Sequence, residues 1–250
     1  TIKPDLVLIR ADRFELLPCA MLSTYSGYKV AQLEAGDLSG VVDNKVRFAI
    51  SHLSDYHFAT NIESETRLKI MGFKNVYNYG SLDVELAKIS LVDSYNAPGT
   101  KYLLVLYHPI PGEDLSEIQA VLKGFPDYEI KIIGSNIDYQ KKFGEDRYSP
   151  LEFLNLMNKA SCIVGNSSSG LKEASIMGVP VVNIGSRQQN RLTPENVVNC
   201  QCIKEDIYNA ISYQLRHGRY EPSELYYQEM TSFKIAQEIR RLLEPPILTR

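Results

Sequence analysis

One stretch of this chain, from Ile163 to Gln188, constrains its fold more than any other. It reads IVGNSSSGLKEASIMGVPVVNIGSRQ: an apolar run, a loop of small residues, a helical segment, a turn at Gly178 and a second apolar run. The pattern predicts strands over 161–164 and 179–184 with a helix between them. A strand, a small-residue loop and a helix in this order begin a βαβ unit. The chain is therefore predicted to be an α/β protein.

The loop that precedes this helix, Gly165–Gly170, is suited to hold an anion such as a diphosphate. N–H groups at a helix start have no acceptor within the helix and face outward, and the loop's glycines let the backbone approach a ligand closely. Three hydroxyl groups of the loop add further donors, on Ser167, Ser168 and Ser169. Glu173 lies one helical turn further on and can accept hydrogen bonds from sugar hydroxyls. The alternative is that Ser168 only caps the helix and Glu173 is a solvated surface acid.

Composition excludes several classes of function. With 44% hydrophobic and 23% charged residues the chain is an ordinary globular protein, and a net charge of −3 without a basic cluster argues against nucleic acid. No apolar run approaches the about 18 residues of a membrane span, and the chain does not open with a secretory signal. Cys200 and Cys202 form a lone C-x-C, which makes a zinc site unexpected and suits a reducing cytoplasm.

Acidic residues follow two predicted strands in the first half of the chain. Asp12 comes after a strand over 3–9, and Glu34 comes after a strand over 29–33. Open α/β sheets place ligand contacts at the carboxyl ends of their strands, so the two acids can converge on one pocket as an acid–base pair. The alternative for Asp12 is a cap of the helix that follows it.

A helix is predicted over 43–54. Apolar residues recur along it at helical spacing and should be buried: Val46, Ala49, Ile50 and Leu53. Arg47 lies on a neighbouring face that could look into a ligand cleft. The alternative for Arg47 is an ion pair with Asp43, one helical turn away.

One polar segment with proline and glycine, SYNAPGT at 94–100, predicts the domain boundary. We expect an N-terminal Rossmann-like domain over 1–95, which carries the catalytic-side residues, and a C-terminal Rossmann-like domain over 96–250. The last helix of the chain can pack back on the first domain. A ligand cleft is expected between the two domains.

Polar residues also end the predicted strands of the second domain. His108 follows a strand over 102–107, and Asn136 follows a strand over 129–133. Arg187 follows the strand over 179–184 and would give a diphosphate a bidentate, permanently charged donor. The alternative for His108 is a packing or capping role.

Four segments together resemble one family. They are LEAGDLSGVVDNKVRFAISHLSDYHF at 33–58, YHPIP at 107–111, GNSSSG-x-x-E at 165–173 and IGSRQ-x-x-R at 184–191. In this order they look like the hydrolysing UDP-N-acetylglucosamine 2-epimerases of sialic-acid and related nonulosonate biosynthesis. The resemblance covers nearly the whole chain.

The resemblance implies a GT-B fold of two Rossmann-like domains and a reaction without metal or other cofactor. UDP would be eliminated across C1–C2 of the sugar, and water would then add with inversion at C2, releasing N-acetylmannosamine. By position, the residues implied in the chemistry are Asp12, Glu34, Asp43 and His108. Those implied in holding the UDP-sugar are Arg47, Asn136, Ser167, Ser168, Ser169, Gly170, Glu173 and Arg187. We expect a cytoplasmic homodimer or higher homo-oligomer.

The sequence departs from this family at several positions. Asn44 stands where the family has a second acid, and an amide cannot exchange protons as a carboxylate does. Gln32 replaces a histidine, and the family's opening βα units do not precede residue 1. We therefore expect a first sheet with an unpaired edge, which needs a partner or a further segment. Two alternatives to an active epimerase follow: a catalytically impaired UDP-sugar-binding homologue and a GT-B glycosyltransferase.

Overall fold

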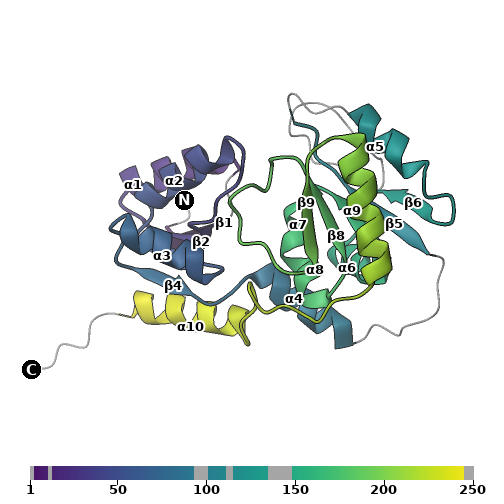
Figure 1. The fold of residues 1–250 in the computed structure, drawn as a ribbon. Helices are drawn as coiled ribbons and strands as arrows, with labels where there is room; N and C mark the ends of the chain where they lie inside the picture. The colour runs from purple at the N-terminus through teal and green to yellow at the C-terminus, as the bar shows by residue number, and fades with distance from the viewer. Residues whose placement is uncertain (1–2, 11–12, 93–100, 111–114, 135–147, 245–250) are drawn as a thin grey trace, which may run out of the picture. The chain divides into compact units, whose positions relative to one another are not determined.

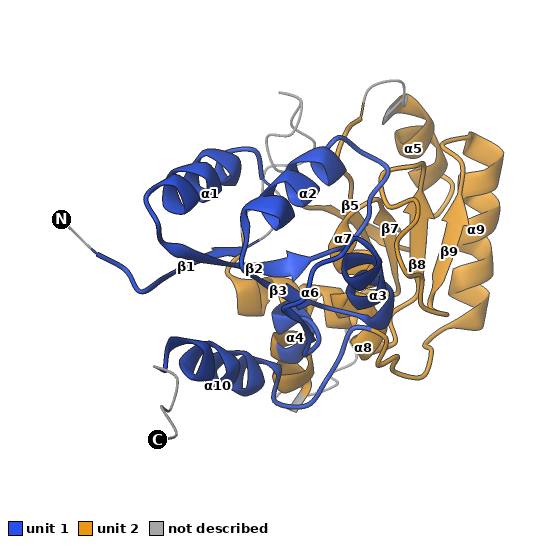
Figure 2. Ribbon diagram, turned by 90° about the vertical axis from the view of Figure 1, so that its left-hand side faces the viewer, with its two compact units in different colours: residues 1–85, 226–250 blue, residues 86–225 orange. Residues whose placement is uncertain are grey.

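The fold consists of two parallel sheets whose strands alternate with helices (Figure 1). The computed structural model describes residues 3–10, 13–92, 101–110, 115–134 and 148–244. By its internal contacts the chain divides into unit 1, Thr1–Glu85 with Tyr226–Arg250, and unit 2, Leu86–Leu225 (Figure 2). The predicted α/β class with two Rossmann-like domains is confirmed.

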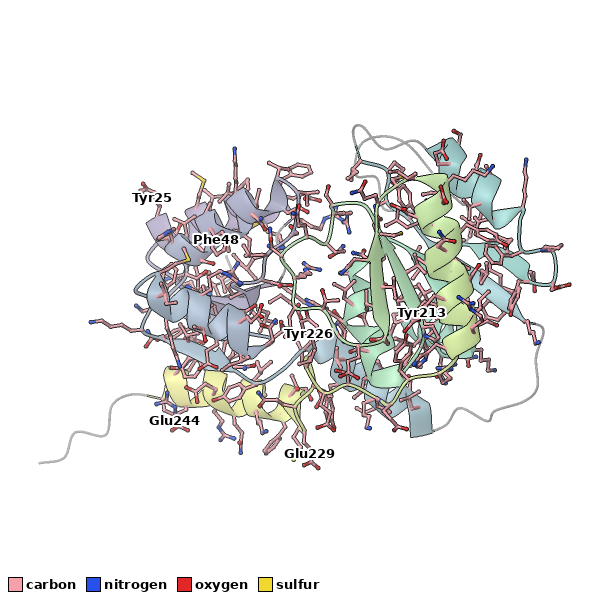
Figure 3. The ribbon with its side chains drawn as sticks, viewed as in Figure 1. Tyr25, Phe48, Tyr213, Tyr226, Glu229 and Glu244 are labelled. Carbon is pink, nitrogen blue, oxygen red and sulfur yellow. The ribbon has the colours of Figure 1, made fainter. Side chains whose placement is uncertain are left out.

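Unit 1 contains a four-stranded sheet in the order β1-β2-β3-β4, with every neighbouring pair parallel. Its strands are β1 (Leu6–Arg10), β2 (Lys29–Ala35), β3 (Tyr56–Ala59) and β4 (Val76–Asn78). Its helices are α1 (Leu16–Tyr25), α2 (Asp43–Leu53), α3 (Ile62–Ile70) and α10 (Thr231–Leu243). Helix α4 (Leu82–Val92) begins in unit 1 and ends in unit 2. β1 is an edge strand of this sheet, and Tyr25 at the end of α1 projects into solvent (Figure 3).

Both faces of the unit 1 sheet are covered by helices. Helices α1 and α2 lie on one face, and α10 lies on the other (Figure 2). The core under α1 and α2 consists of Ile9, Ala20, Val30 and Ile50. The predicted buried face of α2 is confirmed for Ile50, which is fully buried, whereas Val46 and Leu53 are partly buried against the same core.

Helix α10 returns from the end of the chain to complete unit 1. Glu229 and Glu244 bracket it (Figure 3), and Thr231 at its start donates from Oγ1 to the carbonyl oxygen of Tyr79 at 2.7 Å. Ile235 is buried, and it closes a core formed with Ala31, Leu33 and Phe58. Truncating Ile235 should therefore leave a cavity in unit 1.

We expect Ile235→Ala to lower the free energy of unfolding by about 3 kcal/mol, since truncation of a buried isoleucine loses burial and leaves a void. Urea denaturation followed by circular dichroism measures this. Phe233→Ala is the matched control, because Phe233 lies on the same helix and is half exposed. Equal losses in the two variants would contradict the packing of Ile235.

Unit 2 contains a five-stranded parallel sheet in the order β6-β5-β7-β8-β9. Its strands are β5 (Tyr102–Leu106), β6 (Glu129–Ile132), β7 (Cys162–Gly165), β8 (Val181–Ile184) and β9 (Val197–Cys200). Its helices are α5 (Leu115–Leu122), α6 (Pro150–Lys159), α7 (Ser168–Leu171), α8 (Glu173–Met177) and α9 (Lys204–His217). The sequence analysis did not predict β9.

The core of unit 2 lies under α5 and α9, where residues of both helices pack on alternate side chains of β5, β7 and β8. Ser149 and Glu152 form a capping box at the start of α6, and Pro150 occupies the first helical turn, which explains why this helix begins there. Within the described ranges, no helix combines the length and the apolar character needed to cross a bilayer.

Candidate functional site

The serine loop of unit 2 leads from the end of β7 into α7. Ser167 is the residue before the helix, and its side chain makes no capping bond to the helix backbone. Its Oγ instead lies 2.8 Å from Oγ of Ser169. Ser167 and Ser168 are half-exposed. The alternative in which Ser168 caps the helix is therefore wrong, because Ser168 is the first residue of α7 and Ser167 holds the capping position without using its side chain for it.

The predicted helix after this loop is two short helices. Lys172 separates α7 from α8 with backbone angles of φ −91° and ψ −75°, away from regular helical values. Gly178, with φ +65°, ends α8 in the left-handed conformation that the sequence led us to expect for a turn. Because α7 is so short, its dipole is weaker than that of one continuous helix, and individual N–H and O–H donors carry more of any anion binding.

Asn166 joins the serine loop to the strand that ends at His108. Its side chain is fully buried, with Oδ1 accepting from the backbone N–H of His108 at 2.7 Å and Nδ2 donating to the His108 carbonyl oxygen at 2.9 Å. This reciprocal pair continues the pairing of Leu106 with Gly165 beyond the ends of β5 and β7. His108 is thus held at the strand end by two hydrogen bonds.

The backbone carbonyl of Asn166 holds the loop that follows β8. Arg187 donates to it from Nη1 at 3.1 Å, and Gln188 donates from Nε2 at 2.7 Å. The Oε1 of Gln188 in turn accepts from Nη1 of Arg191 at 2.9 Å. We call His108, Asn166, Ser167, Arg187 and Gln188 the Asn166 cluster. It brings three of the predicted site residues together within one unit, and the sequence analysis assigned no role to Asn166 or Gln188.

Packing inside the unit excludes a side chain at Gly165 and leaves little room for one at Gly170, a reason for these glycines that the sequence analysis did not anticipate. A Cβ on Gly165, whose φ is +150°, would lie 2.0 Å from the carbonyl oxygen of Leu106. A Cβ on Gly170 would lie 3.1 Å from Cγ1 of Val181. Close approach of β7 to β5 and of α7 to β8 therefore accounts for both glycines without a ligand.

Glu173 is half-exposed at the first position of α8. Asn136 lies outside the described residues, as does Asp12 of unit 1. Their predicted roles stay predictions.

In unit 1, Glu34 adopts an unusual backbone conformation. It lies inside β2, which extends to Ala35 and is longer than predicted, and its φ of +60° coincides with a register shift between Leu33 and Ala35. Left-handed backbone is unfavourable for residues other than glycine, and it occurs where surrounding structure enforces it. The side-chain Oε1 of Glu34 accepts from Oγ of Ser81 at 3.3 Å, and Ser81 is fully buried.

Arg47 and Asn44 tie the loop after β2 to α2. Arg47 is buried and donates from Nη1 to the carbonyl oxygen of Asp37 at 2.8 Å and to Oδ1 of Asn44 at 2.9 Å. The Asn44 amide also bonds the backbone of Ser39 in both directions, accepting from its N–H at 2.9 Å and donating to its carbonyl at 2.6 Å. Asp43, the first residue of α2, precedes these groups directly. Asn44 thus has a structural role as a donor and an acceptor.

Gln32 has a comparable structural role under α2. It is fully buried, its Nε2 donates to the carbonyl oxygen of Arg47 at 3.2 Å, and its Oε1 accepts from Oγ of Ser51 at 2.6 Å. Both ends of the amide are therefore used between β2 and α2.

A family model described as UDP-N-acetylglucosamine 2-epimerase matches residues 1–240. The chain belongs to the UDP-N-acetylglucosamine 2-epimerase family. A UDP-N-acetylglucosamine 2-epimerase of Neisseria meningitidis is 30% identical over an alignment 255 residues long, which covers 90% of this chain and 67% of that protein. A hydrolysing UDP-N,N'-diacetylbacillosamine 2-epimerase of Legionella pneumophila is 30% identical over an alignment 270 residues long, which covers 96% of this chain and 71% of the relative.

Solved structures of this family share the fold. The S. aureus MnaA–UDP co-structure aligns with a TM-score of 0.78 at 19% identity, covering 96% of this chain and 74% of the other. The Neisseria meningitidis UDP-GlcNAc 2-epimerase bound to UDP-GlcNAc aligns with a TM-score of 0.77 at 17% identity, covering 95% and 76%. At these identities the likeness concerns the fold.

Proposed function

We propose that this member of the family is a hydrolysing 2-epimerase that converts UDP-N-acetylglucosamine, or a related UDP-N-acetylhexosamine, to N-acetylmannosamine and UDP. Hydrolysing relatives of this chain act on UDP-N,N'-diacetylbacillosamine by name, which supports the hydrolysing branch and makes that sugar nucleotide a second substrate to test. The observation that carries the proposal is the Asn166 cluster, in which the residue directly before the serine-lined helix start bonds both the backbone of His108 and the guanidinium of Arg187.

In the proposed reaction a base removes the proton from C2, and the C1–O bond breaks with its electrons leaving on UDP. Water then adds across the resulting double bond, with hydroxyl to C1 and a proton to the opposite face of C2. Asp12, Glu34 and Asp43 are the proposed proton-transfer residues. Arg187, the serine hydroxyls and the N–H groups of the helix start would stabilise the departing diphosphate, and His108 would donate to it.

The test is incubation of the intact gene product with UDP-N-acetylglucosamine in D₂O, followed by NMR. We expect equal amounts of UDP and N-acetylmannosamine, with deuterium at C2. UDP-N-acetylmannosamine without UDP would place the protein in the non-hydrolysing branch. UDP release only when an acceptor sugar is added would favour a glycosyltransferase.

Ser81→Ala should lower kcat about tenfold and leave the Kd for UDP unchanged, because the buried hydroxyl orients the Glu34 carboxylate and is proposed to act on the sugar half of the reaction. Steady-state kinetics and calorimetric titration with UDP measure the two quantities. Ser54→Ala is the control, since the Ser54 hydroxyl bonds only the carbonyl oxygen of Ile50 in its own helix among the described contacts. A rise in KM at constant kcat would contradict an orienting role.

A catalytically impaired UDP-sugar-binding homologue is the second candidate, favoured by the hydrogen bonds of Asn44. Because its amide donates to a carbonyl oxygen, a carboxylate at this position would face that oxygen without a proton between them. For an active enzyme we expect Asn44→Asp to change turnover by less than about threefold and to lower stability by about 1 kcal/mol. UDP binding without turnover in the parent protein, and turnover in Asn44→Asp, would instead establish the second candidate.

A further inference from the structure

The loop that follows β2 is held by arginines from two different helices. Arg47 of α2 donates to the carbonyl oxygen of Asp37, and Arg67 of α3 donates from Nη1 to the carbonyl oxygen of Gly36. Two successive carbonyl groups of this loop therefore each accept from a guanidinium, a permanently charged group whose N–H donors have fixed directions. The sequence analysis assigned no role to Arg67.

The loop begins just after a break in the side-chain alternation of β2. Leu33 packs in the core that contains Phe58, whereas Ala35 packs in the core that contains Ala59. Phe58 and Ala59 are consecutive residues of β3, so they point to opposite faces of the sheet. In a regular strand Leu33 and Ala35 would share one face, because they are two residues apart. The left-handed backbone of Glu34 and the register shift beside it place Ala35 on the other face.

Helix α3 supports the chain directly after this break. Gly36 also has a left-handed backbone, with φ +77°, and a Cβ there would lie 2.6 Å from the carbonyl oxygen of Ser64 in α3. Gly36 therefore lies directly against the helix. Arg67, about one turn beyond Ser64, donates to the carbonyl oxygen of the same glycine. A close steric fit and a hydrogen bond from one helix thus hold the residue two positions after Glu34.

A residue other than glycine keeps a left-handed backbone only where its surroundings enforce it, and a bulge beside an active site re-aims a side chain. We propose that Arg67 is a positioning residue: through Gly36 it maintains the left-handed backbone of Glu34, and with it the direction in which the Glu34 carboxylate points. Ser81 donates to that carboxylate, whereas Arg67 acts on the backbone. The inference rests on the proposed function, in which Glu34 transfers a proton, but the hold on the backbone can be tested without turnover.

Arg67→Met removes the donor from a half-exposed position and keeps a side chain of similar length. With UDP-N-acetylglucosamine as substrate, we expect kcat to fall at least about tenfold while KM and the Kd for UDP stay within about twofold of the parent, because the proposed diphosphate site lies in unit 2. Arg67→Lys keeps a cation that can donate to the same oxygen, so it should recover most of the lost kcat. Should Arg67→Met fail to fold, Arg67→Gln gives the same test with a shorter, uncharged side chain.

Lys69→Met is the matched control. It removes a positive charge from the same helix, but the Lys69 side chain pairs with Glu65 and not with the loop, so kcat should equal that of the parent. Equal losses of kcat in Arg67→Met and Lys69→Met, or a rise in KM at constant kcat in Arg67→Met, would contradict the positioning role.

A double-mutant cycle with Ser81→Ala separates positioning from a loss of packing. If Arg67 and Ser81 both act through Glu34, their effects on kcat are coupled, and the double variant should retain at least about threefold more activity than the product of the single losses. Losses that multiply fully would show that Arg67 acts independently of Glu34 and would overturn the inference.

Amide hydrogen exchange tests the hold on the backbone directly. The N–H groups of Leu38 and Ser39 donate to side-chain oxygens of Asp37 and Asn44, so their exchange reports whether the loop keeps its conformation. We expect exchange over 36–39 to be at least about fivefold faster in Arg67→Met than in the parent, and unchanged in Lys69→Met. Faster exchange in a protein that shows no turnover would support the hold and contradict the epimerase activity, whereas unchanged exchange would overturn the inference even in an active enzyme.

Discussion

Gly165→Ala should destabilise unit 2 by more than about 4 kcal/mol, because the added methyl group has no room. The new Cβ would lie 2.0 Å from the carbonyl oxygen of Leu106, inside the van der Waals radii of both atoms. Neither partner can move easily, since Leu106 belongs to β5, which pairs with β6 on one side and β7 on the other. The φ of +150° at Gly165 adds a further backbone cost.

Gly218→Ala provides the matched control for this prediction. Gly218 lies in the same unit and also has a positive φ, +77°, but a Cβ there would have no atom within 4 Å. Gly218→Ala should lower the free energy of unfolding by about 1–3 kcal/mol, which is the cost of the backbone conformation alone. Urea denaturation of both variants measures the difference, and similar midpoints would show that β7 does not approach β5 as closely as described.

Asn166→Asp should weaken UDP binding at least about tenfold at neutral pH and lower the free energy of unfolding by about 3 kcal/mol. The new side chain has nearly the same shape, but an ionised carboxylate cannot donate to the carbonyl oxygen of His108 and would face it as a buried negative charge. His108 would then lose one of the two bonds that hold it. Attraction of Arg187 to the new carboxylate would also disturb the hydrogen bond from Arg187 to the backbone carbonyl of residue 166.

The pH dependence of Asn166→Asp distinguishes loss of the hydrogen bond to His108 from a general loss of packing. Burial and the facing carbonyl raise the pKa of the new carboxyl above its unfolded value, which is about 4. A protonated carboxyl can both accept from and donate to His108, as the amide does. Stability relative to the parent should therefore recover as pH falls towards about 4 and be lost as pH rises through the raised pKa. A deficit that is independent of pH would contradict the reciprocal bond to His108.

The sequence predicted those parts of the fold that follow from apolar patterning. The strand over 102–107 corresponds to β5, and the strands over 161–164 and 179–184 correspond to β7 and β8, within two residues at each end. Sequence patterning did not predict the features that depend on tertiary contacts. Asn199 interrupts the apolar run of β9, which pairs with one strand at the sheet edge, and Lys172 interrupts a helix without any proline or glycine at the break.

The sequence also predicted only part of the candidate site. Residue type and strand-end position were enough to select His108, Ser167 and Arg187, because the chemistry of an anion site is visible in those side chains. The role of Asn166 was not predictable, since a buried amide that bonds the backbone of a strand 58 residues away leaves no local pattern. Glu34 shows the same limit. The sequence identified it as a candidate site residue, but it did not predict its left-handed backbone or its hydrogen bond with Ser81.

The return of α10 to unit 1 sets the order in which this chain can finish folding during its synthesis. The polypeptide enters unit 2 within α4 and comes back only at Tyr226, so all of unit 2 leaves the ribosome before unit 1 is complete. Until Ile235 emerges, the face of the nascent sheet that bears Leu33 and Phe58 lacks α10. The unit 1 sheet is thus translated before the unit 2 sheet but completed after it, and its exposed apolar face would need protection by a chaperone in the meantime.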